Sequence, residues 1–481
     1  MATLTVGLIF VVLIWLGVRN NTPSESSLNE PPDLTGTTFE NFVFPEGFDI
    51  RQYDGITLNF IIENNINANI LSVEIEEFTK LTGINVKIRP IDYDTFIQRI
   101  SLDFISKAGD YQLIYSDPYQ TLNRYHDDLE VLNPYLSGSD RPGLQIPISD
   151  FFETQLEVSS YFEDRESLYA IPFDSTTMVL YYREDIFNAY KDDFFKQKGY
   201  DWTPGGEAFT WERYIEVVEW IDKNVPKDIV KYGSGQMAQA HNSVFCEFSN
   251  ILAAYGGDYF IDHNIGTLGL ETFTESDVLS DAFIRSLEIY KQLLSVAAPN
   301  SVNWNWANTA EAFANGEIAM MINWDENFSN LNYSDTSLVR DKVKTAILPY
   351  GSERSANIFG GSGIGINKYS SQEEKDAAWF FITWATSKEM QLRILKDPNG
   401  GALPTIQSAY KDLIIEEQDQ TDHIEIVLKA WEPDYIYLRP KLQNFYFIEQ
   451  ILIEELHLMI LNDLNPEDVA NSIHNRIQGI K

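Results

Sequence analysis

Short apolar segments alternate with amphipathic segments early in the chain, and this alternation constrains the fold more than any other feature. Residues 57–62, 86–90 and 111–115 are apolar strand candidates, and 71–78 and 94–104 between them carry apolar residues at helical spacing. Strand and helix units that follow one another in this way predict a parallel, doubly wound α/β sheet.

The strand and helix pattern returns in the second half of the chain. Residues 309–315 indicate a helix that Gly316 stops, and 318–322 indicate a strand. Ser371 and Glu374 have capping-box spacing before another helix, and Asn465-Pro466 opens a last one. The chain has 481 residues, of which 44% are hydrophobic, so we expect two or three folded core units rather than one.

The charge and the cysteine content exclude several classes of protein. The 35 Lys and Arg against 72 Asp and Glu give a net charge of −37, which disfavours nucleic-acid binding. Cys246 is the single cysteine, so neither an intrachain disulfide nor a thiolate metal cluster can form. The six histidines lack HExxH spacing. We therefore expect no metal site and no cofactor.

The amino terminus indicates export. Residues 1–19 form a hydrophobic anchor or signal, because 2–18 carry no charge and approach the length of a membrane span. An uncleaved anchor is favoured over a cleaved signal because no clear cleavage site follows, and a misassigned start codon is a further alternative. Residues 20–54 indicate a tether, although the four phenylalanines in its second half suggest that this half packs on the folded body: Phe39, Phe42, Phe44 and Phe48.

Five groups of segments, in order, resemble the extracellular solute-binding proteins that feed ABC importers of sugars and oligosaccharides (maltose and multiple-sugar type, family 1). The resemblance runs from about Thr57 to Gly479. It is carried by Glu76–Val86, Asp110–Asp117, Leu168–Asp174 with Leu180–Phe187, Glu311–Trp324 and Gly360–Ile366.

The resemblance implies an α/β, two-lobed, periplasmic-binding-protein-like fold of type II, in which a ligand binds between lobes joined by crossing hinge strands. Lobe 1 would comprise 55–172 plus 364–403, and lobe 2 would comprise 173–363 plus 404–481. The chain would cross near 171–177, 357–363 and 402–405. Two departures stand out: no lipobox cysteine follows the apolar run, and the stretch after the first strand, 63–67, is polar where an aromatic is frequent.

Most candidate ligand-binding residues lie at predicted strand ends and crossings, and three form a late aromatic and cationic group before a helix: Trp431, Tyr437 and Arg439. Aromatic rings cover the apolar face of a sugar, while carboxylates, amides and arginines bind its hydroxyls. The candidates are Glu63, Asn64, Asp117, Asp174, Trp324, Asp325, Gly361, Ser362, Trp431, Tyr437 and Arg439. Each also has a structural interpretation, such as a turn aspartate at Asp117 or a structural ion pair at Arg439. For Trp304 and Trp306, core packing is the favoured interpretation.

The sequence therefore predicts a binding protein without catalytic residues. It would capture a carbohydrate-like solute outside the cytoplasm by lobe closure and pass it to an ABC permease. One alternative is a membrane-anchored ligand-sensing module that is not coupled to transport. A second is a glycoside hydrolase, although 72 acidic residues make a carboxylate pair uninformative.

Overall fold

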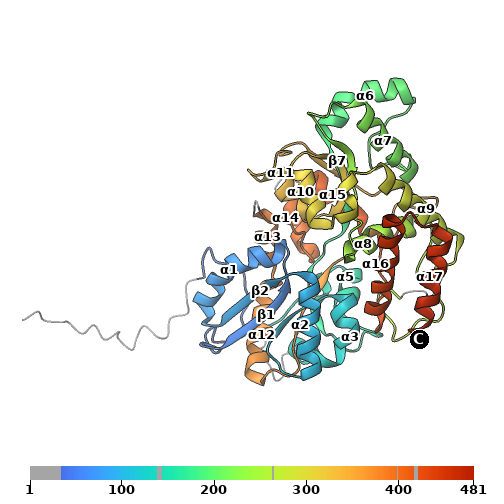
Figure 1. Ribbon diagram of the computed structural model, residues 1–481. Coiled ribbons are helices and arrows are strands. Elements are labelled where there is room, and N and C mark those ends of the chain that lie inside the picture. Colours follow the sequence, from blue (N-terminus) through green and yellow to red (C-terminus); the bar gives the residue numbers. More distant parts are fainter. Residues whose placement is uncertain (1–33, 138–143, 263–264, 398, 416–420, 481) are drawn as a thin grey trace, which may run out of the picture.

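The chain folds into two α/β lobes, each built on its own sheet (Figure 1). The computed structural model describes residues 34–137, 144–262, 265–397, 399–415 and 421–480. The first lobe is the one built on strands β1 to β4 and β10, and the second lobe is the one built on strands β5 to β8.

The sheet of the first lobe has the strand order β2-β1-β3-β10-β4. Its strands are β1 (Thr57–Glu63), β2 (Asn85–Ile91), β3 (Leu113–Ser116), β10 (Ser362–Ile366) and β4 (Ala170–Asp174). Strand β1 pairs in parallel with β2 and β3, as the early alternation predicts. Strand β10 is antiparallel to β3 and β4, because it returns from the second lobe, so the sheet is mixed rather than wholly parallel.

The sheet of the second lobe has the order β6-β7-β5-β8. Its strands are β6 (Tyr232–Gly235), β7 (Ile318–Trp324), β5 (Met178–Arg183) and β8 (Val343–Ala346). Strand β5 runs antiparallel to β7 and β8, and β6 runs parallel to β7. Two short strands, β9 (Asn357–Ile358) and β11 (Ile436–Tyr437), form a separate parallel pair.

Helices cover both sheets. The longer ones up to the end of β7 are α1 (Ile66–Thr82), α2 (Tyr93–Ser106), α5 (Glu153–Ser160), α6 (Glu184–Lys198), α7 (Trp211–Asn224), α8 (Asn242–Ala254), α9 (Asp281–Val296) and α10 (Trp306–Ala314). The later ones are α11 (Asn327–Tyr333), α12 (Gln372–Ala385), α13 (Lys388–Lys396), α14 (Gln407–Ile415), α15 (Thr421–Ala430), α16 (Phe445–Leu461) and α17 (Pro466–Gln478). The short helical turns are η2 (Pro118–Leu122), α3 (Asn123–Tyr125), η3 (His126–Asp128), α4 (Asn133–Ser137), η4 (Ile148–Asp150) and η5 (Pro299–Asn303).

Local signals set several helix starts where the sequence predicts them. Ser371 and Glu374 form the predicted capping box of α12, and Asn465 caps α17, whose first residue is Pro466. The helix expected at 309–315 begins earlier, because Asn305 caps α10 at Trp306.

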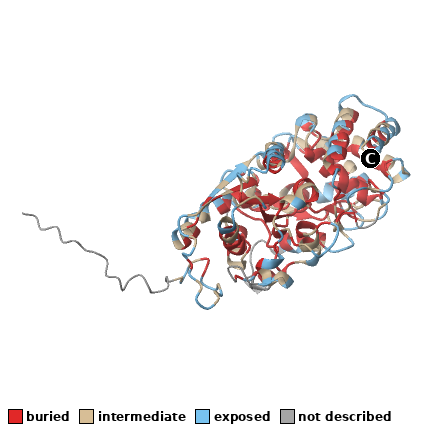
Figure 2. Ribbon diagram, turned by 90° about the horizontal axis from the view of Figure 1, so that it is seen from below, coloured by how far each residue is buried: buried red, intermediate tan, exposed pale blue. Residues whose placement is uncertain are grey.

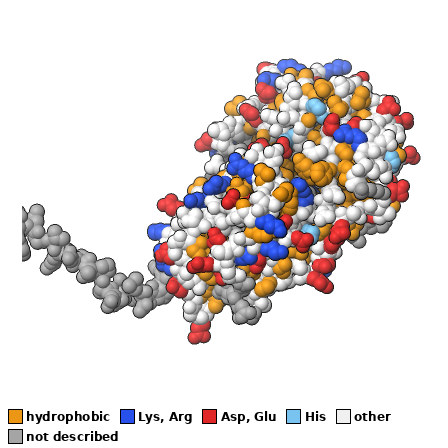
Figure 3. All heavy atoms as spheres, turned by 60° about the horizontal axis from the view of Figure 1, so that its bottom comes forward, with side chains coloured by type: hydrophobic (Ala, Val, Ile, Leu, Met, Phe, Trp, Pro, Cys, Tyr) orange, Lys and Arg blue, Asp and Glu red, His pale blue; other side chains and the backbone are white. Residues whose placement is uncertain are grey.

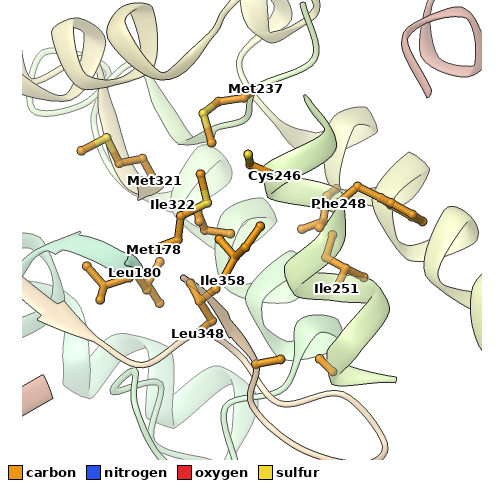
Figure 4. Close-up of a cluster of buried hydrophobic side chains, with 14 of the residues drawn as sticks. Met178, Leu180, Met237, Cys246, Phe248, Ile251, Met321, Ile322, Leu348 and Ile358 are labelled. Atoms are coloured by element: carbon orange, nitrogen blue, oxygen red, sulfur yellow. The ribbon is translucent and has the colours of Figure 1, made fainter. Parts of the chain in front are cut away.

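Each lobe buries its own apolar interior (Figure 2). In the second lobe, β7 is buried along its length up to Trp324, and every residue of α8 is buried. Figure 4 shows side chains of β5, β7 and α8 meeting there, among them Met178, Ile322 and Phe248. Two such interiors satisfy the expectation of more than one core unit.

The second half of the predicted tether packs on the first lobe. Phe39 is fully buried, and its ring lies 6.1 Å from Phe78 and 6.0 Å from Phe380. The indole of Trp384 donates a 2.8 Å hydrogen bond to Thr38. Within the described ranges, no helix combines the length and the apolar character needed to cross a bilayer. The anchor predicted at residues 2–18 lies outside the described residues.

Of the three segments predicted to cross between the lobes, the first contacts each of the other two. The first runs from the end of β4 to the start of β5, and the Gly360 amide of the second donates to Thr176 O at 2.8 Å. The Ser175 hydroxyl donates to Leu403 O of the third at 2.7 Å. The lobe boundaries themselves remain a prediction.

The outer surface mixes charges of both signs. The face drawn in Figure 3 carries acidic and basic side chains near one another, with hydrophobic side chains between them.

Candidate functional site

A cavity of about 230 Å³ lies between the two lobes. Its walls come from the ends of β1, β3 and β4 in the first lobe and from β7, α10 and α11 in the second. The residues that line it are Glu63, Asn64, Asn65, Ile66, Asn69, Tyr93, Tyr115, Asp117, Asp174, Thr176, Asn242, Trp306, Ala307, Asn323, Trp324, Glu326, Asn327, Gly360 and Arg439.

Strand direction explains the acidic edge of the first lobe. Strands β1, β3 and β4 run the same way, because β10 is antiparallel to both β3 and β4. Glu63 ends β1, Asp117 follows β3 and Asp174 ends β4, so the three carboxylates meet at one edge of the sheet. The carboxyl edge of an α/β sheet is where such folds bind ligands.

Two of these carboxylates are held by hydrogen bonds. The Tyr115 hydroxyl donates to Asp174 Oδ2 at 2.7 Å, and the Thr176 amide donates to Asp174 Oδ1 at 3.1 Å. Asp117 Oδ1 accepts from the amides of Tyr119 and Gln120 at 2.7 and 2.9 Å and so caps η2. Burial is the main cause that raises the pKa of both Asp117 and Asp174, and these hydrogen bonds oppose the shift.

Aromatic rings form the opposite wall. Trp306, at the first position of α10, lies 6.2 Å from Trp324 in an edge-on arrangement. Tyr93 of the first lobe lies edge-on to Trp306 at 6.1 Å, so the wall spans both lobes. Gly360 permits this packing, since a Cβ there would lie 2.6 Å from the Trp324 ring. Such rings offer an apolar face to a ligand that also has a polar rim.

Glu63 and Glu326 differ from the other acids of the cavity. Glu326 Oε2 is buried and has no hydrogen-bond partner among the described residues. Burial, together with the negative charges of Asp117 and Asp174, raises the pKa of Glu63 to about 8. Burial, together with Asp174, Asp325 and Glu63, raises the pKa of Glu326 well above its usual value. Both carboxyls are therefore available to a ligand.

Arg439 is the one cation among the residues that line this cavity. Its guanidinium is buried and lies over the Tyr119 ring at 3.9 Å. Its charge lowers the pKa of Asp117 and of Glu63, and so offsets part of the raising effect of burial. In the ranges that the structure describes, no group of three or more His, Cys, Asp and Glu could hold a metal ion.

A family model for bacterial extracellular solute-binding proteins matches residues 66–392. The chain belongs to this family. The two-lobed architecture expected from the sequence is thereby confirmed, as is the resemblance to solute-binding proteins of sugar ABC transporters.

Two curated relatives of this solute-binding protein cover most of its length. A probable amino-acid ABC transporter periplasmic-binding protein of Sinorhizobium fredii is 23% identical over 440 residues, which is 89% of this chain and 90% of the relative. The erythritol/L-threitol-binding protein of Mycolicibacterium smegmatis is 22% identical over 387 residues, 78% of this chain and 72% of that protein.

Solved structures agree on the fold. Maltose-bound MalE3 of T. maritima superposes with a TM-score of 0.73 at 22% identity. A solute-binding protein of Agrobacterium radiobacter in complex with ribitol gives 0.74 at 22% identity. Each match covers 89% of this chain and 100% of the other.

Six of the predicted ligand residues of this solute-binding protein line the cavity: Glu63, Asn64, Asp117, Asp174, Trp324 and Arg439. Asp325 lies next to it but is only 1% exposed, and its Oδ1 accepts from the Thr177 amide at 2.6 Å, so it secures the first crossing. At the second crossing Gly360 lines the cavity, whereas Gly361 and Ser362 do not. A Cβ at Gly361 would lie 2.3 Å from the Phe359 ring.

Trp431 and Tyr437 lie away from the cavity. The Trp431 ring packs against Phe152 at 5.2 Å within an apolar cluster. Tyr437 belongs to β11, which pairs with β9 rather than with a strand that ends at the cleft, and its hydroxyl donates to Asp258 at 3.0 Å. Being aromatic and close to Arg439 in sequence was therefore not sufficient to place either residue at the site.

Other cavity residues were not singled out from the sequence as ligand-binding. The most notable is Trp306, which lines the cavity and also packs against both hydrophobic cores, so the favoured core-packing interpretation holds only in part. The neighbouring Trp304 packs on the second-lobe core. Asn305 caps α10 and so begins this helix at Trp306, but the cap alone does not show that this end of the helix lies at the cleft. The remaining ones include Asn65, Tyr93, Tyr115, Asn242, Glu326 and Asn327.

Proposed function

We propose that this protein captures a small, hydroxylated, carbohydrate-like solute in the cavity between its lobes, outside the cytoplasm, and delivers it unaltered to an ABC permease. The observation that carries the proposal is the composition of the cavity. An aromatic wall, carboxylates and amides line one cavity between the lobes, which suits a solute with an apolar face and a hydroxyl rim.

The size of the cavity favours a small solute. A volume of about 230 Å³ is below the ~300–1,000 Å³ of pockets for drug-sized ligands. It suits a monosaccharide or a polyol better than a long oligosaccharide. The relatives support this range, because one is named for erythritol and L-threitol and another was solved with ribitol.

Closure of the lobes would complete the site. Carboxylates of the first lobe and the Trp306 and Trp324 rings of the second reach one ligand only when the lobes are together. Hydrogen bonds join the first crossing segment to the second and to the third, which supports a hinge formed by these segments. Binding energy would thereby favour the closed form, which is the form that a permease can distinguish from the open one.

The remaining predictions are part of the same proposal. The ligand-binding residues would be the six predicted ones that line the cavity together with Trp306, Tyr93, Glu326 and Asn327. The protein would act without catalysis. Residues 2–18 would hold it at the outer face of the membrane or direct its export.

A thermal-shift screen over monosaccharides, polyols and disaccharides tests the proposal. A solute present at 100 times its Kd stabilises the folded state by about 2.7 kcal/mol, and the melting temperature should rise accordingly. Trp324→Ala should abolish the shift, and Trp324→Phe, which keeps a ring, should retain part of it. A panel in which no solute raises the melting temperature would contradict the proposal.

A further inference from the structure

The charge of the cavity goes beyond what a neutral sugar requires. Four carboxylates line it, Glu63, Asp117, Asp174 and Glu326, against the single guanidinium of Arg439. Asp325, 1% exposed and adjacent to the wall, leaves Oδ2 without a hydrogen-bond partner among the described residues. Hydroxyl groups can accept or donate hydrogen bonds, but they bring no charge to offset this excess.

The carboxylates divide into two structural classes. Asp117 and Asp174 accept hydrogen bonds from backbone amides and tyrosine hydroxyls, so the fold itself uses them. No side-chain hydrogen bond or ion pair is recorded for Glu63 or Glu326 among the described residues, and Glu326 Oε2 is fully enclosed. Glu63 is half-buried at the cavity wall. Burying a carboxylate oxygen without a partner costs several kcal/mol, so the enclosed Oε2 of Glu326 indicates a partner supplied from outside.

The residues around Glu63 and Glu326 indicate which kind of cation could bind there. A metal ion is disfavoured, because no cluster of three or more acidic, His or Cys groups within the described ranges could coordinate one. The rings of Tyr93, Trp306 and Trp324 instead form an aromatic wall, and aromatic faces attract organic cations. Carboxylate oxygens accept N–H hydrogen bonds that are stronger when the donor is charged.

We propose that the solute of this protein carries a protonated amine, which Glu63 and Glu326 bind from opposite lobes while the aromatic wall covers its carbon chain. This inference rests on the proposed function and narrows its substrate class from hydroxylated solutes to amino sugars and amino polyols. The amine would also draw the two lobes together, because each lobe supplies one of its carboxylates.

Proton release from Glu63 on binding provides a second test of the proposal. Burial and neighbouring charge raise the pKa of Glu63 to about 8, so in the free protein this carboxyl holds a proton for much of the time near neutral pH. Binding a cation favours the ionised form, so binding should release a proton. The charged and titratable groups that face Glu63 and Glu326 are Asp92, Tyr93, Tyr115, Asp117, Asp174, Asp325 and Arg439.

Matched pairs of solutes test the inference. The pairs are D-glucamine with D-sorbitol, D-glucosamine with D-glucose, and 3-amino-1,2-propanediol with glycerol, each titrated calorimetrically in phosphate buffer. The aminated member of the pair that fits should bind at least about ten-fold more tightly than its neutral partner. For D-glucamine, whose amine stays protonated, affinity should rise by roughly five-fold or more between pH 6 and pH 8.5. Buffers of different ionisation enthalpy should show about one proton released.

Variants assign the effect to the two carboxyls. Glu63→Gln and Glu326→Gln should each weaken binding of the aminated member by about ten-fold or more, and by a clearly larger factor than they weaken binding of the neutral member. Glu432→Gln, an exposed carboxylate outside the cavity, is the matched control and should change neither.

The outcomes separate this inference from the proposed function. Tighter binding of the aminated members with proton release supports both. If the neutral members bind equally well or better, the inference is overturned while the proposed function stands. If no member of any pair binds, the proposed function fails for solutes of this size and the inference falls with it.

Discussion

Tyr115 donates a hydrogen bond of 2.7 Å from its hydroxyl to Asp174 Oδ2, and so joins β3 to the end of β4 at the base of the cleft. The strand between them, β10, arrives from the second lobe, and β4 leads directly into the first crossing. The pair therefore lies where the binding site and the hinge meet.

Removing this hydroxyl should destabilise the fold. Tyr115→Phe would leave Asp174, which is 2% exposed, with only its weaker partners. Hydrogen bonds to charged groups contribute about 1.5–3 kcal/mol, and we expect a loss of that size in the free energy of unfolding at neutral pH. Urea denaturation measures it. Tyr93→Phe is the control, since its hydroxyl lies 3.4 Å from Asp117 and should cost less. Wild-type stability for Tyr115→Phe would show that the bond contributes nothing.

Replacing Trp306 should impair binding more than folding, because its ring is only partly buried where it packs on the hydrophobic cores. Its ring lines the cavity between Tyr93 and Trp324, so Trp306→Ala removes the centre of the aromatic wall. Loss of a stacking ring is worth roughly 1–3 kcal/mol, by analogy with aromatic contacts elsewhere, which corresponds to about 5- to 150-fold in Kd. Trp306→Phe should keep most of the affinity. Calorimetry with a solute identified by thermal shift measures both, and an unchanged Kd for Trp306→Ala would place the ligand elsewhere.

Stability should fall as the pH rises because of Glu63. Its pKa is about 8 in the folded protein and near the ordinary value of 4.5 once unfolded. Between these values the unfolded chain has released the proton while the folded protein retains it, so alkali favours unfolding. Glu63→Gln removes the cost of ionising this carboxyl in the folded protein. It should therefore raise the free energy of unfolding by roughly 1–3 kcal/mol above pH 8, with little difference from the wild type below pH 4.5.

Chemical denaturation at pH 5, 7 and 9 follows that effect, with Glu432→Gln as the exposed control. A wild-type profile that stays flat across this range, or a Glu63→Gln variant less stable than wild type at pH 9, would be inconsistent with a raised pKa at Glu63.

Asp325 should matter to the first crossing through its Oδ1 atom. It accepts from the Thr177 amide at 2.6 Å and from the Thr176 hydroxyl at 3.1 Å. Asp325→Ala leaves that buried amide unpaired and should cost about 1–3 kcal/mol. Asp325→Asn retains the acceptor, and burial raises the pKa of Asp325 to about 7, so this variant should match the wild type more closely. Equal stability of the two variants would contradict this role.

Local patterns in the sequence predicted several individual elements, whereas the two-lobed architecture was expected from the family resemblance. The alternation over 57–115 predicted β1 to β3, and the capping box at Ser371 and Glu374 and the Asn-Pro pair located later helices. The directions of β10 and β4 could not be predicted from local sequence patterns, because they depend on where the chain returns from the second lobe.

The site was only partly predictable for a related physical reason. Glu63, Asp117 and Asp174 follow strands, and a strand end has a known place in an α/β fold. Trp306 and Tyr93 start helices, and which residue of a first helical turn faces the cleft depends on how the lobes pack. Tyr437 was predicted at the site but lies outside it. Nothing in its local sequence reveals that β11 pairs with β9.

A crystal structure of the complex with the solute that raises the melting temperature most would test the central claim most directly. The account predicts one chemically intact solute molecule between the lobes, with its carbon skeleton against Trp306 and Trp324 and its polar groups within hydrogen-bond distance of Glu63 and Glu326. Electron density for that solute outside this cavity, or density for a cleaved product inside it, would contradict the account.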